Sequence, residues 1–60
     1  MIVYIHINNF TNEVRSFGSI KKLSEETNIK IDNLYACFGR KKLKERETYE
    51  YRIIKTKIEN

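Results

Sequence analysis

SIKKLSEETNIKIDNLYACFG, residues 19–39, is the stretch that decides the fold. Ser19, or the glycine before it, can cap a helix that runs from about Ser19 to Thr27. Asn28 can take the left-handed backbone conformation that often ends a helix, and Ile29 beyond it can fold back onto the core. The first half of this stretch therefore predicts a short helix with a cap at each end.

The second half predicts another short helix, from about Ile31 to Phe38, which Gly39 is expected to stop. Apolar residues at helical spacing unite the two helices and their joint, namely Ile20, Leu23, Ile29, Leu34 and Phe38. Two short helices joined by only about three residues form a helix-turn-helix, whose second helix can lie in the major groove of DNA. A short helical hairpin with no nucleic-acid role would show the same spacing.

Strands are predicted before this helical pair. β-Branched residues favour a strand over Ile2–Ile7, with Val3, Ile5 and Ile7 on its inward face. Three asparagines within residues 8–12 then predict a tight turn, because asparagine tolerates left-handed backbone. The returning strand, Glu13–Phe17, offers Val14 and Phe17 to the core.

A last strand is predicted over Thr48–Ile58, where the alternation changes phase at Ile53 and Ile54 and indicates a bulge or a two-sided strand. The predicted fold class is α+β, a single winged helix-turn-helix-like domain over residues 1–60. Its elements follow the order strand, strand, helix, helix, strand.

Positive charge gathers after the second helix. The chain has 12 Lys and Arg against 8 Asp and Glu, which gives a formal net charge of +4. Residues 1–39 hold four of each sign, so the whole excess lies in residues 40–60. Residues 40–47 predict a basic loop or the tip of a wing, whose cations could meet DNA phosphates. A solvated loop that keeps the chain soluble is the plainer alternative.

A family resemblance covers about residues 10–52 and rests on EVRSFGSIKKL (residues 13–23), TNI (27–29), Leu34, Phe38 and YEY (49–51). This pattern resembles the small DNA-binding repeats attached to phage and intron homing endonucleases, and the short helix-turn-helix proteins of phages and mobile elements. No nuclease module is present, so the resemblance implies DNA binding without cleavage. It implies a regulator, of transcription for example, in a phage or mobile element.

The outward face of the second helix departs from that family, because it shows Ile31, Asp32, Asn33, Tyr35 and Ala36. Asp32 would repel phosphate unless it caps the helix. Asn33 could read adenine and Tyr35 could touch a phosphate or a thymine methyl, although both are more often ordinary surface residues. The predicted DNA contacts are Lys30, Asn33, Tyr35, Arg40, Lys41, Lys42, Lys44 and Arg46.

Size and composition argue against an enzyme, since a chain of 60 residues has little room for a substrate cavity beside its core. The single cysteine and the single histidine predict no disulfide, no metal site and no cofactor. Cys37 is expected to be a small core residue, and His6 a half-exposed sheet residue. The N-terminus lacks a basic leader and a long apolar segment, so we expect a cytoplasmic protein without a membrane span.

Two further hypotheses concern partners. The same basic surface could bind an acidic protein, so that the chain would act as a small phage-encoded inhibitor or adaptor of a larger host protein. The apolar strand Ile2–Ile7 could expose an edge that a second copy covers, which would make a homodimer with two helix-turn-helix units.

Overall fold

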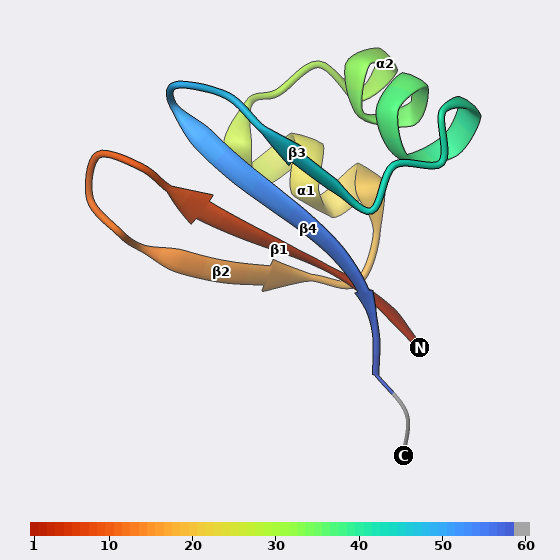
Figure 1. Ribbon diagram of the computed structural model, residues 1–60, viewed down its shortest axis with the longest axis horizontal. Coiled ribbons are helices and arrows are strands. Elements are labelled where there is room, and N and C mark those ends of the chain that lie inside the picture. Colours follow the sequence, from red (N-terminus) through yellow and green to blue (C-terminus); the bar gives the residue numbers. More distant parts are fainter. Residues whose placement is uncertain (59–60) are drawn as a thin grey trace.

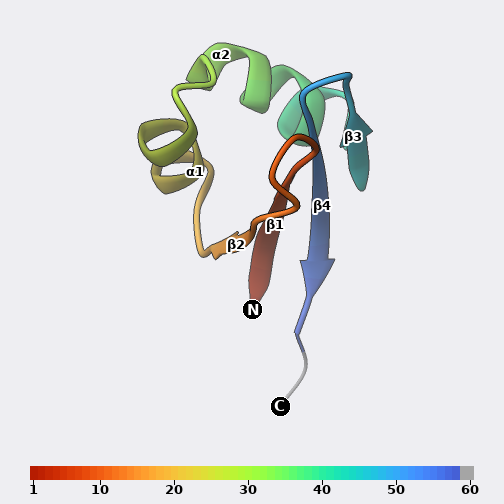
Figure 2. The same cartoon turned by 90° about the vertical axis from the view of Figure 1, so that its left-hand side faces the viewer.

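Two β-hairpins and a pair of helices make up the protein, whose computed structural model describes residues 1–58. The elements are β1 Ile2–Asn8, β2 Val14–Phe17, α1 Ile20–Thr27, α2 Ile31–Leu34, the π-helical segment η1 Tyr35–Arg40, β3 Glu45–Glu47 and β4 Tyr51–Lys57. The strands form one antiparallel sheet in the order β2-β1-β4-β3 (Figure 1). Figure 2 shows that the helices lie on one face of this sheet, which confirms the α+β class.

The β1–β2 turn forms as the asparagines predict. The side-chain oxygen of Asn8 accepts hydrogen bonds from the backbone N–H groups of Phe10 (2.8 Å) and Thr11 (3.2 Å). Asn12 takes a left-handed conformation, with φ at 62°. Asparagine supports both features with its short amide side chain, so the hairpin closes without a glycine.

Helix α1 has both predicted caps. The Ser19 hydroxyl accepts the backbone N–H of Lys22 (3.1 Å), and Asn28 ends the helix with φ at 61°. The joint to the second helix is fixed by the Ser24 hydroxyl, which donates to the carbonyl oxygen of Ile29 (2.7 Å). Ile29 packs, partly buried, against the core. The two caps and the joint between the helices therefore follow from side chains close by along the chain.

The prediction that Gly39 stops the second helix is wrong. Segments α2 and η1 are continuous, and the backbone N–H of Lys41 still donates to the carbonyl of Ala36, five residues earlier (3.0 Å). Gly39 does not adopt a positive φ, whereas Lys42 does, at 52°. The chain therefore leaves the helix at Lys42, and the Leu43 N–H donates back to the Cys37 carbonyl (2.9 Å).

The inward face of β1 is the opposite of the predicted one. Tyr4 is buried and its ring forms a T-shaped pair with that of Phe38, with centroids 5.7 Å apart, while Val3, Ile5 and Ile7 lie on the face without helices. Val3, Ile5 and Ile7 form the more regular apolar set, because His6 and Asn8 share the face of Tyr4, so alternation alone selects the wrong face. The helix pair determines which face is buried, because its aromatic and leucine side chains pack closely against the large ring of Tyr4.

Two further predictions about the sheet, the burial of Val14 and the exposed edge of β1, are also wrong. Val14 pairs with Ile7 on the uncovered side of the sheet and is 60% exposed, so it is not a core residue. Strand β1 pairs with β2 and with β4, so it is a central strand and offers no edge to a second copy. The homodimer predicted through this edge therefore loses its basis.

The second hairpin contains a strand that was not predicted from the sequence. Residues 45–47 form β3, which pairs with β4, so the predicted basic loop is shorter and the last strand begins at Tyr51. The tip of this hairpin is the turn at residues 48–50, which carries Tyr49 and Glu50 in place of the predicted basic tip. The register of β4 against β1 is uninterrupted, so Ile53 and Ile54 reflect a two-sided strand and not a bulge.

The core lies between the helix pair and the sheet. Its buried residues are Tyr4, Phe17, Ile20, Leu23, Leu34, Cys37, Phe38 and Ile53. Phe17, the helix residues and Cys37 were predicted as core from their spacing, whereas Ile53 was not. Within residues 1–58, the helices lack the length and apolar content needed to cross a membrane.

Candidate nucleic-acid interface

Six cations gather where the second helix ends. The end of η1, the loop after it and the end of β4 lie on the same side of the molecule, near the start of β1 (Figure 1). The cations that these segments carry are Arg40, Lys41, Lys42, Lys44, Lys55 and Lys57. The backbone N–H of Lys55 donates to the carbonyl of Lys44 (2.7 Å), which extends the β3–β4 ladder and sets these two lysines side by side. We call this region the basic end.

Four of these lysines line one surface groove of about 490 Å³. The lysine groove is lined by Ile2, Lys42, Leu43, Lys44, Lys55, Thr56 and Lys57. Ile2 and Leu43, which are partly exposed, supply apolar contact area in the same groove. No carboxylate of the described residues lines this groove, so an anion there would meet positive charge alone.

One lysine of the groove is held in place by the helix. The ammonium of Lys55, half-buried, donates to the carbonyl oxygen of Phe38 (3.4 Å). A cation at this position also complements the partial negative charge at a helix C-terminus. Lys42, Lys44 and Lys57 are exposed and can adapt to a ligand. The groove thus combines one positioned charge with three adaptable ones.

Arg46 does not belong to the basic end, although it was predicted among the DNA contacts. Its register partner is Ile53, so its side chain lies on the helix-covered face of the sheet, where its guanidinium contacts the sulfur of Cys37. Arg46 is half-buried and Cys37 is buried. This arginine therefore packs between β3 and η1 and is not free to follow a phosphate backbone.

The other predicted contacts are at the surface but are spread along the second helix. Lys30 and Asn33 are exposed near its start, and Tyr35 is 49% exposed in the next turn. Asp32 is also exposed, and no side chain makes a capping hydrogen bond at this helix start. Ten residues of helix span about 15 Å, so this acidic beginning lies well apart from Arg40 and the lysine groove.

Lys55 and Lys57 are members of the site that the sequence reading missed. They alternate along β4, a signal that both point to one side of a strand. Their approach to Lys44 depends on the pairing of β3 with β4, and β3 is only three residues long. No local pattern reveals a strand this short inside a run of charged residues.

No protein-family model matches the chain, and no curated protein or solved structure matches it either. The geometry and the charge of the basic end are therefore the basis on which a function can be assigned.

Proposed function

We propose that this protein binds double-stranded DNA through its basic end, as a non-catalytic regulator of the kind found in phages and mobile elements. The observation that carries the proposal is the lysine groove, in which Lys42, Lys44, Lys55 and Lys57 converge with no carboxylate of the described residues among them. Phosphate contacts of this kind supply most of the affinity of small DNA-binding domains.

The second helix supports a specific orientation on the duplex. Its C-terminal end joins the lysine groove, because Lys55 caps the carbonyl of Phe38. With the lysines on the backbone, the exposed Asn33 and Tyr35 are the side chains of this helix available to base edges. Asp32 at the helix start opposes deep insertion, so we expect the backbone contacts to dominate and sequence preference to be modest.

The proposal predicts how strongly the affinity for DNA depends on salt concentration. If the four groove lysines neutralise about four phosphates, the slope of log affinity against log salt is about −3.6, and affinity falls about 150-fold between 50 and 200 mM salt. Fluorescence anisotropy with a labelled random duplex of about 20 base pairs measures this slope directly.

A matched pair of variants separates the groove from net charge. Lys44→Gln with Lys57→Gln removes two charges from the groove, and Lys21→Gln with Lys22→Gln removes two exposed charges on α1, away from the groove. The groove variant should reduce the salt slope by about two and the control variant should leave it nearly unchanged. Equal losses in both variants would mean that net charge alone attracts DNA, and would overturn the assignment of the groove.

An acidic protein is the second candidate partner, and the apolar contact area of Ile2 and Leu43 in the groove favours it. Polyglutamate is a suitable probe because it has carboxylates without phosphates or bases. If polyglutamate displaces duplex from the protein at equal charge concentration, the surface recognises acidic chains in general and the DNA proposal fails.

A further inference from the structure

The end of the sheet opposite the lysine groove carries a second groove, whose rim is built from both hairpin turns. The backbone N–H of Asn9 donates to the carbonyl of Glu50 (3.0 Å), and its side-chain amide donates to the carbonyl of Thr48 (3.1 Å). These bonds tie the β1–β2 turn to the β3–β4 turn. The two turns therefore form one rim.

Two aromatic rings project from this rim. Phe10 and Tyr49 meet edge to face with centroids 5.6 Å apart, yet they are 64% and 85% exposed. Just inside, the rings of His6 and Tyr51 stack at 5.5 Å. Exposed aromatic side chains held in a fixed arrangement are typical of binding surfaces, because they offer large contact area at little cost in conformational entropy.

The groove itself lies between this rim and the end of α1, and its volume is about 510 Å³. Its aromatic and charged lining includes Phe10, Tyr51, Glu13, Glu26, Glu50 and Arg15. We call it the acidic aromatic groove. Its volume accommodates a long side chain together with part of the backbone that carries it.

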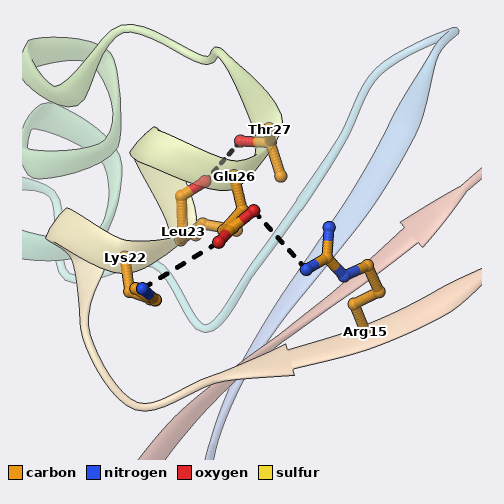
Figure 3. A network of polar contacts seen from close by, with 5 residues as sticks. All are labelled: Arg15, Lys22, Leu23, Glu26 and Thr27. Atoms are coloured by element: carbon orange, nitrogen blue, oxygen red, sulfur yellow. Dashed lines mark hydrogen bonds and ion pairs between the residues drawn. The ribbon is translucent and has the colours of Figure 1, made fainter.

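Arg15, which lines the groove, already forms an ion pair. The guanidinium of Arg15, on β2, lies 3.6 Å from a carboxylate oxygen of Glu26, on α1 (Figure 3). Glu26 also faces Lys22 one helical turn earlier, at 3.9 Å. Glu13 and Glu50 form no ion pair among the described residues. The groove therefore presents two uncompensated carboxylates beside aromatic rings.

His6 adds no competing charge at neutral pH. Its burial, and secondly the nearby Arg15, lower the pKa of His6, whereas Glu13 acts in the opposite direction. The imidazole is therefore neutral under physiological conditions, and its stacking on Tyr51 is that of an uncharged ring.

We propose that the acidic aromatic groove binds an arginine or lysine side chain of a basic protein segment. Charge complementarity favours this occupant, because Glu13 and Glu50 can pair with a guanidinium and the aromatic residues Phe10 and Tyr51 line the same groove. The same carboxylates repel phosphate, so the groove is unsuited to nucleic acid. This site is independent of the lysine groove, and together they would allow the chain to hold DNA and a basic protein segment at once.

The probe is a fluorescein-labelled hexapeptide of alternating arginine and glycine, and its control replaces each arginine by citrulline, which has the same shape without the charge. Binding is followed by anisotropy and by amide shifts in ¹H–¹⁵N spectra. We expect the arginine peptide to bind at least about tenfold more tightly than the citrulline peptide, with shifts centred on Phe10, Glu13, Glu50 and Tyr51. Equal binding of both peptides, or shifts elsewhere, would overturn the proposal.

Matched variants complete the test. Glu13→Gln with Glu50→Gln removes the two uncompensated carboxylates, and Glu25→Gln with Glu47→Gln removes two exposed carboxylates that do not line the groove. The first pair should weaken the arginine peptide about tenfold and the second less than about twofold. If light scattering instead shows self-association that the first pair abolishes, the occupant is the basic end of a second copy, and the proposal of a separate basic partner is wrong.

Discussion

The two grooves sit on the same pair of central strands yet carry opposite charge. Strand β4 begins with Tyr51 in the acidic aromatic groove and ends with Lys55 and Lys57 in the lysine groove, about 13 and 20 Å further along. Strand β1 runs antiparallel beside it and likewise contributes to both. Charge is thus separated along the strand direction, and each end can be altered without reshaping the other.

The largest effect is expected for a substitution in the core beneath the two grooves. Phe38 is fully buried, its ring contacts Tyr4 and its carbonyl accepts from Lys55. Phe38→Ala should cost about 3–5 kcal/mol, which is about the whole stability of a domain this small. Urea denaturation should show loss of folding, and DNA and peptide binding should disappear together. Retention of either ligand by this variant would mean that one groove does not depend on the common core.

Charge reversal at one end should separate the two ligands. In Lys44→Glu with Lys57→Glu, two attractive contacts with DNA become repulsive, so affinity for duplex at low salt should fall by about a hundredfold or more. Affinity for the arginine peptide should change less than about twofold, because these side chains lie more than a Debye length from Glu13 and Glu50. Anisotropy titrations of both ligands at 0.15 M salt check this, and a parallel loss of peptide binding would contradict the separation.

A smaller effect is expected at the border of the acidic aromatic groove, where Asn28 lines the groove and ends α1 with φ at 61°. Asn28→Val should destabilise the fold by about 1–2 kcal/mol, since a β-branched residue is strained in left-handed backbone. Asn28→Gly is the matched control and should be nearly neutral. Midpoints of urea unfolding measure both, and equal losses would place the effect in the amide side chain instead of the backbone.

The smallest effect concerns pH and His6. Because the folded pKa of His6 is lowered, the unfolded chain binds the proton more readily, so its contribution to stability is unchanged above the unfolded value of about 6.5 and becomes unfavourable as pH falls through the window below it. Unfolding midpoints should therefore drop between pH 7.5 and 5.5, and His6→Gln should reduce that drop. A drop of the same size in the variant would assign the pH dependence to other groups.

Local chemistry explains why parts of the fold could be predicted from sequence. Ser19 and Asn28 reveal the ends of α1 because a cap needs only its neighbours along the chain. The choice of Tyr4 over Val3, Ile5 and Ile7 as the inward residue depends on the helices above β1, since alternation along the strand favours the three β-branched residues. Neither composition nor periodicity contains that information.

The candidate site shows the same division between local and long-range information. Arg40, Lys41, Lys42 and Lys44 are visible as a charged run, and the structure places them at the basic end. The β3–β4 register sets Lys55 beside Lys44, so Lys55 belongs to the basic end. The same register pairs Arg46 with Ile53, so Arg46 does not belong to it. The acidic aromatic groove was not predicted at all, since Asn9 brings together two turns that lie 39 residues apart.

The measurement that tests the central claim most directly is the affinity of the unmodified protein for a random DNA duplex at low and at near-physiological salt. If the lysine groove grips the phosphate backbone, the duplex binds tightly at low salt and affinity falls about 150-fold between 50 and 200 mM. Absence of binding at low salt, where a converging set of four lysines should hold any duplex, would contradict the claim.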